Sequence, residues 1–276
     1  MKLWSRVAVA VMSIALVGYV LYRIFAHSSA LLQPALVTPH MNAHRVLSPS
    51  LDARVDRLLH ERQDTDRSGR PKLIALTFDD GPYAVSTPLL LEALRDLHVK
   101  ATFFLIGRDA EQYPELVRRI ERYGNEIGNH TYSHPNLDQL SPREVRAQLT
   151  TGRAVLQHLV HDPSIGLLMR PPHGRYTEET VEIAQSLGYH VVLWTQDPGD
   201  WQTLTASEIA RLVEEHATAP SIVLLHSGKL ATVQGVEQIV PLFRSNGYQF
   251  VTVGELLRRA PPKDINHPAK MSLKRG

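Results

Sequence analysis

The chain has 276 residues, with 30 Lys and Arg against 28 Asp and Glu, and a formal net charge of +2. Hydrophobic residues make up 43% of it and charged residues 21%, which excludes wholesale disorder and collagen-like repeats. The small net charge gives no electrostatic reason to expect nucleic acid as a partner. Because the chain has 14 histidines and no cysteine, imidazole and carboxylate are its strong metal ligands, and disulfides, thiolate sites and a cysteine nucleophile are excluded.

The N-terminal residues 1–26 are predicted to be a membrane anchor or signal segment. Residues 7–22 carry no charge and would span about 24 Å as a helix, against a hydrocarbon layer of roughly 30 Å. Small residues at 28–30 would suit a signal peptidase, but Arg23 interrupts the approach to them. We therefore expect an uncleaved anchor, with a cleaved signal peptide as the alternative. Either outcome places the remainder outside the cytoplasm, membrane-anchored or secreted.

Composition divides the rest of the chain into three parts. Residues 27–70 are predicted to form a linker, which includes a short amphipathic helix near 51–62. A folded domain is expected over residues 71–260. Residues 261–276 are rich in Lys and Arg and are expected to form a basic tail.

Strand-like and helix-like segments alternate through the expected domain. Repeated units of this kind favour a parallel sheet with helices outside, either as a barrel or as a doubly wound sheet. Seven strands are expected, at residues 73–78, 101–106, 125–129, 165–169, 189–194, 222–225 and 249–253.

Helix boundaries are marked by recognisable end signals. Residues 141–144 (SPRE) and 205–208 (TASE) each match a capping box, in which a hydroxyl and a carboxylate satisfy the first free N–H groups. Pro142 suits the first helical position. Gly188 follows an apolar segment where a helix C-cap is expected.

Polar residues with catalytic potential follow five of the expected strands. In a parallel α/β domain the carboxyl ends of the strands form one edge, where ligands bind. We therefore expect these side chains to lie together: Asp79, Asp80, His130, His134, Arg170, Asp197, Asp200 and His226.

Each of these residues also has a structural interpretation when taken alone. Asp79 and Asp80 could be capping carboxylates of a turn, and His226 a satisfied core histidine. His130 and His134 have the i, i+4 spacing of a helical metal pair, but Pro135 disfavours helical geometry at His134 and predicts a loop. Their shared position after the strands favours an active site.

Five motifs in order resemble the polysaccharide deacetylase (NodB homology) family, carbohydrate esterase family 4. The motifs are TFDDGP (77–82), HTYSHP (130–135), RPPHG (170–174), DPGDW (197–201) and VLLH (223–226). The resemblance implies a distorted (β/α) barrel of about seven strands. It also implies metal-dependent removal of N-acetyl groups from an N-acetylated polysaccharide, with peptidoglycan or a related N-acetylglucosamine glycan as the expected substrate.

The resemblance assigns a divalent metal to Asp80, His130 and His134. Three ligands without thiolate leave room for water and substrate, as in catalytic zinc sites. Zn²⁺ is our first expectation, although nitrogen and oxygen ligands also accept Co²⁺, Ni²⁺ or Mn²⁺.

The resemblance also assigns the proton carriers. Asp79 would be the general base and Arg170 would orient it, because a carboxylate paired with a guanidinium is held in place. His226 would be the general acid that protonates the leaving amine. Asp200 would hydrogen-bond the His226 imidazole and favour its charged form.

Four further residues are expected to contact the substrate. A backbone N–H at His173 or Tyr83 would help to hold the oxyanion. Trp201 and Leu224 match positions of a small apolar pocket for the acetyl methyl group. The chain has His173 where the family commonly has Tyr, which bears on substrate fit more than on the chemistry.

Two other hypotheses stay open from the sequence. The chain could deacylate a lipid-linked amino sugar or a small amide, which a membrane tether would also suit. Alternatively it could be a catalytically silent glycan-binding protein. The complete set of base, acid and ligands disfavours this last hypothesis.

Overall fold

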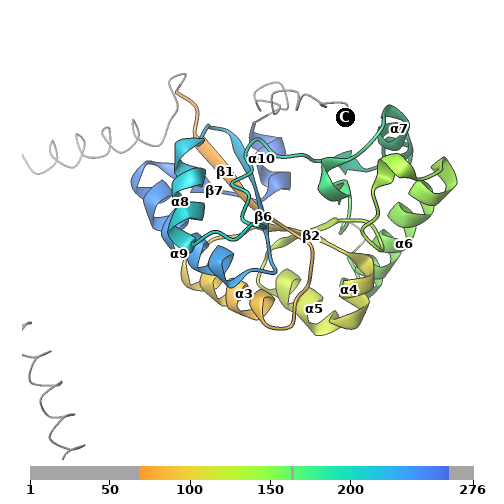
Figure 1. The fold of residues 1–276 in the computed structure, drawn as a ribbon, viewed down its shortest axis with the longest axis horizontal. Helices are drawn as coiled ribbons and strands as arrows, with labels where there is room; N and C mark the ends of the chain where they lie inside the picture. Colours follow the sequence, from red (N-terminus) through yellow and green to blue (C-terminus); the bar gives the residue numbers. More distant parts are fainter. Residues whose placement is uncertain (1–68, 163–164, 261–276) are drawn as a thin grey trace, which may run out of the picture. The chain divides into compact units, whose positions relative to one another are not determined.

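A seven-stranded, all-parallel sheet lies at the centre of the computed structural model, which describes residues 69–162 and 165–260 (Figure 1). The strands are β1 (Lys72–Asp79), β2 (Thr102–Leu105), β3 (Glu126–Asn129), β4 (Leu168–Met169), β5 (His190–Val191), β6 (Ser221–His226) and β7 (Tyr248–Phe250). The helices are α3 (Ser86–Asp96), α4 (Gly107–Gln112), α5 (Pro114–Arg122), α6 (Pro142–Val160), α7 (Glu178–Ser186), α8 (Ala206–Glu215), α9 (Leu230–Ser245) and α10 (Val253–Arg259). Short 3-10 turns are η1 (Leu137–Gln139) and η2 (Pro172–Gly174).

The sheet is curled toward a distorted barrel. Its order is β5-β4-β3-β2-β1-β6, and β7 pairs with the start of β1. The segment after β5 reaches the opposite edge, where Gln196 forms a parallel bridge with Val223 of β6. The Thr195 N–H donates to the Ile222 carbonyl at 2.9 Å. The two edges are therefore joined by this short contact instead of a full strand pair.

Alternation along β1 separates an outer from an inner face. Leu76 and Phe78 belong to the larger core cluster, which the sheet forms with surrounding helices such as α3 and α9. Leu73 and Ala75 belong to a second cluster that includes Val253 of α10. Thr77 and Asp79 continue this second series, since alternate residues of a strand share a face. The inner face therefore changes from apolar to polar toward the carboxyl end of β1.

The capping predictions are confirmed. Ser141 and Thr205 each accept a hydrogen bond from the backbone N–H three residues on, with the reciprocal bond also present. Gly188 has φ +79° directly after Leu187, the C-cap of α7. This left-handed conformation explains the glycine, because a Cβ would strain it.

Five of the expected strands are shorter than predicted: β2, β3, β4, β5 and β7. β4 and β5 have two residues each, and the backbone carbonyls of Val192 and Leu193 accept hydrogen bonds from Arg170 instead of extending the sheet. The expected strand 249–253 ends early because the Thr252 side chain accepts from the Glu255 N–H and begins α10.

The predicted anchor and basic tail, and nearly all of the predicted linker, lie outside the described residues. Within residues 69–162 and 165–260, no helix has both the length and the apolar character needed to cross a bilayer. The domain boundaries stay a prediction.

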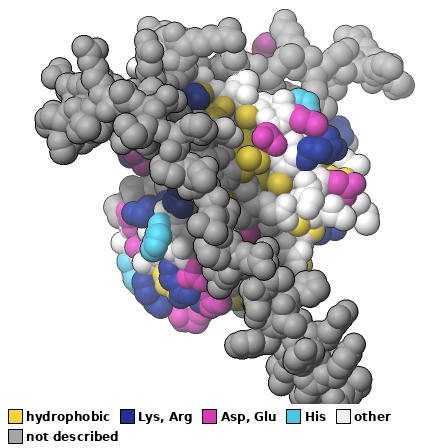
Figure 2. Space-filling model, turned by 90° about the vertical axis from the view of Figure 1, so that its left-hand side faces the viewer, with side chains coloured by type: hydrophobic (Ala, Val, Ile, Leu, Met, Phe, Trp, Pro, Cys, Tyr) yellow, Lys and Arg dark blue, Asp and Glu magenta, His cyan; other side chains and the backbone are white. Residues whose placement is uncertain are grey.

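Charges of both signs share the described surface. On the face drawn in Figure 2, Lys and Arg side chains lie beside Asp and Glu side chains. Arg211 and Glu215, for example, pair at 2.6 Å along α8. On this face, the mixture of charges provides no extended cationic field for a polyanion.

Candidate active site

The carboxyl ends of four strands bring the predicted residues to one edge of the sheet. Asp79 ends β1 and His226 ends β6, and the two are directly paired in the strand register. His130 follows β3, and Arg170 follows β4. The predicted convergence at this edge is therefore observed.

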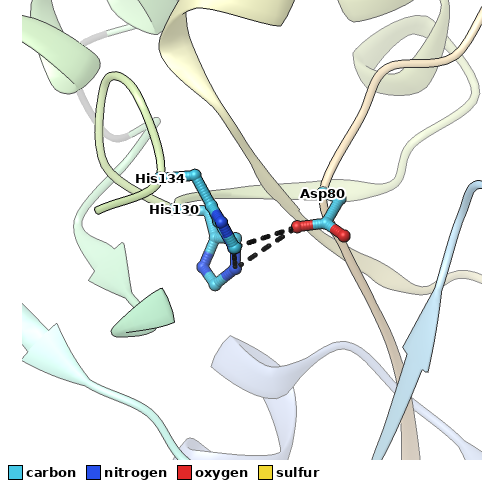
Figure 3. Close-up of side chains that lie close together, drawn as sticks. All are labelled: Asp80, His130 and His134. Atoms are coloured by element: carbon cyan, nitrogen blue, oxygen red, sulfur yellow. Dashed lines mark hydrogen bonds and ion pairs between the residues drawn. The ribbon is translucent and has the colours of Figure 1, made fainter. Parts of the chain in front are cut away.

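Asp80, His130 and His134 form a compact cluster of potential ligands (Figure 3). The Nε2 atoms of the two histidines lie 3.2 Å apart. Asp80 Oδ1 lies 3.2 Å from His134 Nε2 and 3.7 Å from His130 Nε2. Figure 3 shows the carboxylate facing both imidazole rings across a small gap.

Unusual backbone geometry places these ligands. Asp80 has φ 66°, Thr131 has φ 69° and His134 has φ 62°, all in the left-handed region. The His134 N–H donates to Thr131 Oγ1 at 3.0 Å. The histidine pair thus lies on a loop, as Pro135 predicted, and positive φ at non-glycine residues is typical of functional sites.

Hydrogen bonding and burial prepare His130 to be a ligand. Its Nδ1 lies 2.8 Å from the Arg170 carbonyl oxygen, which can only accept, so Nδ1 carries the proton and Nε2 presents a lone pair. Burial lowers the pKa of His130, which favours the neutral form. Burial pushes the pKa of Asp80 upward, but His134 and the charges of His130 and His226 outweigh it and leave that pKa below its ordinary value.

The cluster fits a divalent metal. Asp80 Oδ1 is buried without a hydrogen-bond partner, which is costly for a carboxylate oxygen that binds nothing. Ligand atoms around a tetrahedral ion with bonds near 2.0–2.1 Å lie about 3.3 Å apart, close to the separations in the cluster. Two imidazoles and one carboxylate leave a fourth position for water or substrate.

Asp79 and Arg170 form a buried ion pair beside this cluster. Arg170 Nη1 donates to Asp79 Oδ1 at 2.7 Å, and the other carboxylate oxygen lies 3.7 Å from His130 Nε2. The guanidinium also donates to Thr77 Oγ1 at 2.7 Å and stacks 4.2 Å from the Phe104 ring centroid. The pairing therefore leaves Oδ2 of Asp79 directed toward the ligand cluster.

His226 and Asp200 form a second polar pair on the opposite side of β1. His226 Nδ1 lies 2.7 Å from Asp200 Oδ1, and the His226 backbone N–H donates to Asp200 Oδ2 at 2.8 Å. Burial lowers the pKa of His226, but the hydrogen bond and charge of Asp200, with Asp79 and Asp80, raise it overall above its ordinary value.

The four predicted substrate residues differ in exposure. Trp201 is 57% exposed and Tyr83 is 37% exposed, whereas Leu224 is buried on the same face of β6 as His226. His173 has φ 56°, and its ring packs edge to face on His134 with centroids 4.7 Å apart. The Tyr83 backbone N–H already donates to Thr87 Oγ1 at 2.8 Å.

Several supporting residues were not predicted. Thr77 alternates with Asp79 on β1, so its polarity on an apolar strand was a usable signal. Ser227 donates to the Asp79 carbonyl at 3.3 Å, and Thr232 Oγ1 donates to Asp200 Oδ2 at 2.6 Å. No local pattern predicts these last two contacts, because their partners are far away in sequence.

Asp197, a further strand-end candidate, supports a turn. Its Oδ1 accepts the Gly199 N–H at 2.8 Å. Burial raises the pKa of Asp197. The turn it stabilises leads directly to Asp200.

Comparison with known proteins gives a consistent family. The polysaccharide deacetylase family model matches residues 66–192. A peptidoglycan-N-acetylglucosamine deacetylase of Bacillus cereus is 39% identical over 192 residues, which cover 68% of this chain and 89% of that protein.

Solved structures extend the similarity to the fold. A crystal structure of a peptidoglycan N-acetylglucosamine deacetylase, in complex with 4-naphthalen-1-yl-N-hydroxybenzamide, has a TM-score of 0.66 and 35% identity, covering 68% of this chain and 89% of that one. A carbohydrate esterase family 4 pseudoenzyme from Bacillus anthracis has a TM-score of 0.63 and 29% identity, covering 67% of this chain and 65% of that one. The chain belongs to the polysaccharide deacetylase family, carbohydrate esterase family 4.

Proposed function

We propose that the chain is a metal-dependent N-deacetylase of an N-acetylglucosamine glycan, with peptidoglycan as the first candidate substrate. The observation that carries the proposal is the Asp80, His130 and His134 cluster, with Asp79 on one side and His226 on the other. Neither a turn nor a hydrogen-bonded core would need a potential base and a potential acid beside a buried carboxylate oxygen that accepts no hydrogen bond.

Asp80, His130 and His134 would hold the metal, with Zn²⁺ as the first choice. A bound divalent ion lowers the pKa of water from about 15.7 toward 7 and polarises a carbonyl oxygen. The residues would hold it through a carboxylate and two imidazoles, and the Arg170 carbonyl fixes the His130 tautomer that leaves Nε2 free to bind.

Asp79 would accept the proton of the attacking water as general base. Its Oδ1 is held by Arg170, while Oδ2 faces the ligand cluster. The buried guanidinium, with its hydrogen bonds to Thr77 and to backbone carbonyls, keeps that carboxylate in one orientation. Asp79 is thus placed to take a proton beside the metal site.

His226 would donate the proton that the leaving amine requires. Asp200 accepts from Nδ1, so Nε2 is the nitrogen that can give up a proton to the substrate. The raised pKa of His226 keeps more of the imidazole charged near neutral pH. An acid paired with a carboxylate and a base paired with a guanidinium can act in the same turnover.

For the oxyanion, the His173 N–H is favoured over that of Tyr83, since the latter is already engaged by Thr87. Leu224 lies on the inner face beside His226 and suits the acetyl methyl group. Trp201 is exposed and offers an apolar ring to a sugar.

The names of the relatives support the choice of glycan. A peptidoglycan-N-acetylglucosamine deacetylase shares 39% identity over 192 residues. A catalytic domain held outside the cytoplasm by residues 1–26 would lie near cell-wall glycan, in agreement with that substrate.

A silent glycan-binding role is the second candidate, because the family includes a pseudoenzyme. Here, however, all the proposed chemical positions are filled and converge. Asp79, the proposed base, is also paired with Arg170 at 2.7 Å.

The test is acetate release by the full-length protein in detergent, loaded with Zn²⁺, from peptidoglycan and N-acetylglucosamine oligomers. We expect release that a chelator stops and Zn²⁺ restores, and Asp79→Asn should abolish release while Zn²⁺ still binds. Release that persists without metal would contradict the proposal. Glycan and metal binding without any release would favour the silent role.

A further inference from the structure

We propose that Thr232, in the first turn of α9, is a positioning residue for the general acid His226, acting through Asp200. The expected effect of Thr232 on catalysis rests on the proposed function, in which His226 is the general acid. Its geometry stands independently of that function. None of the five sequence motifs includes Thr232.

Asp200 is the buried centre of the contact. Its side chain is 0% exposed, so each carboxylate oxygen needs partners within the protein. Oδ1 accepts from His226 Nδ1 at 2.7 Å, whereas Oδ2 accepts from the His226 backbone N–H at 2.8 Å and from Thr232 Oγ1 at 2.6 Å. Thr232 is therefore the one donor to this carboxylate among these three that does not belong to His226.

The hydroxyl of Thr232 has an unusual partner for a helical threonine. A threonine within a helix commonly donates to the carbonyl three or four residues earlier. Thr232 is 1% exposed and donates instead to a carboxylate 32 residues away in sequence. This bond ties the segment before α8 to the start of α9.

The position of Thr232 also suits a carboxylate electrostatically. It is the third residue of α9, a helix of 16 residues, and the N-terminal end of a helix favours negative charge. The contact therefore fixes the rotamer of Asp200. Since Asp200 holds Nδ1 of His226, it also fixes the direction in which Nε2 presents its proton.

The kinetic test compares Thr232→Val, which keeps the shape and removes the donor, with Thr232→Ser, which keeps the donor. For the full-length Zn²⁺-loaded enzyme on N-acetylglucosamine oligomers, Thr232→Val should lower kcat about tenfold with little change in KM, a fraction of the 10²–10⁴ that a general acid contributes. Thr232→Ser should restore most of kcat. A kcat within twofold of wild type for Thr232→Val would overturn the proposal.

A matched control measures how much the loss of a buried threonine hydroxyl outside the active site affects stability and kcat. Thr102 is also fully buried and donates to a carboxylate, that of Glu126, at 2.8 Å. Thr102→Val should lower the melting temperature but leave kcat within about twofold. An equal loss of kcat in this variant would show that Thr232 has only a structural role.

A double-mutant cycle tests whether Thr232 affects kcat through Asp200. If Thr232 acts through Asp200, adding Thr232→Val to Asp200→Asn should lower kcat no further, since residues in one hydrogen-bond network are not additive. Independent, multiplicative losses would overturn the proposal.

Nuclear magnetic resonance separates this inference from the proposed function. The His226 Nδ1–H resonance of the ¹⁵N-labelled protein should shift in Thr232→Val and return in Thr232→Ser, whether or not the enzyme is active on glycan. An unchanged resonance would overturn the inference alone. A wild-type protein that releases no acetate would overturn the proposed function alone.

Discussion

His226 and Asp79 occupy paired positions on neighbouring strands, yet each has its own charged partner. Asp79 is tied to Arg170, and His226 is tied to Asp200. The two partners have charges of opposite sign. The Arg170 guanidinium therefore holds the Asp79 carboxylate in place, whereas the Asp200 carboxylate favours the protonated imidazolium form of His226. This arrangement of single residues supports the proposed roles of Asp79 as proton acceptor and His226 as proton donor.

The pH dependence follows from the His226–Asp200 pair. The pKa of His226 is raised above 6.5, so its protonated form is lost only as pH rises through this higher value. Asp200→Asn removes the largest contributions that raise this pKa, the charge-assisted hydrogen bond to Asp200 and the charge of Asp200. We expect the alkaline limb of kcat/KM to move to lower pH, and kcat to fall at least about tenfold. If the alkaline limb of the kcat/KM profile did not move in Asp200→Asn, this would contradict the role of His226 as general acid.

Removal of Arg170 should be costly because its charge and that of Asp79 are both buried. Arg170→Met leaves Asp79 buried without its guanidinium partner, and breaking a buried pair typically costs about 3–5 kcal/mol. Urea unfolding of the variant should show a loss of this size, together with loss of acetate release. The exposed pair Arg211 and Glu215 offers a control, since Arg211→Met should cost at most about 1 kcal/mol.

At the scale of elements, α6 closely approaches, at a glycine, the loop that carries His130 and His134. A Cβ on Gly152 would lie 2.5 Å from Asn129 Oδ1 and 3.0 Å from the Thr131 carbonyl carbon. Asn129 and Thr131 flank His130, so the packing of this helix sets the position of a ligand. The site thus depends on a contact outside its motifs.

Gly152→Ala should therefore weaken Zn²⁺ binding as well as stability. We expect a loss of about 1–3 kcal/mol by urea unfolding, as for overpacking of a core, and at least tenfold weaker Zn²⁺ affinity in a chelator competition. Gly235→Ala is the control, because its Cβ would meet a side-chain methyl of Ile209 at 3.3 Å. If both variants bind Zn²⁺ like wild type, α6 does not position the loop.

Element positions were largely predictable, whereas element lengths were not. All seven expected strands exist, because apolar runs bounded by polar residues are a local signal. The length of β5 depends on Arg170, which takes the carbonyls of Val192 and Leu193 and is a tertiary effect. The start of α10 was readable as Thr252 followed three residues later by Glu255, but the apolar alternation of 249–253 obscured it.

On the scale of the whole molecule, the curled sheet explains why the motifs converge. Parallel strands carry their following residues to one edge, and the bridge between Gln196 and Val223 brings the β5 side round to β6. The convergence of Asp79, Asp80, His130, His134, Arg170 and His226 was therefore predictable from order alone. The contacts of Ser227 and Thr232 were not, because they depend on how distant segments pack.

Metal binding should stabilise the whole fold, since the ligands come from separate segments. With free Zn²⁺ at about 100 times its dissociation constant, the gain is about 2.7 kcal/mol, visible as a rise in melting temperature. His134→Ala should reduce this rise strongly. His216→Ala, which removes an exposed histidine on α8's C-cap, should leave it unchanged.

The most direct measurement is a crystal structure of the Zn²⁺-loaded protein with anomalous data at the zinc edge. The account predicts one strong peak about 2.0–2.2 Å from Asp80 Oδ1, His130 Nε2 and His134 Nε2. Full zinc loading in solution with no peak among these three atoms, or with the peak elsewhere, would contradict it.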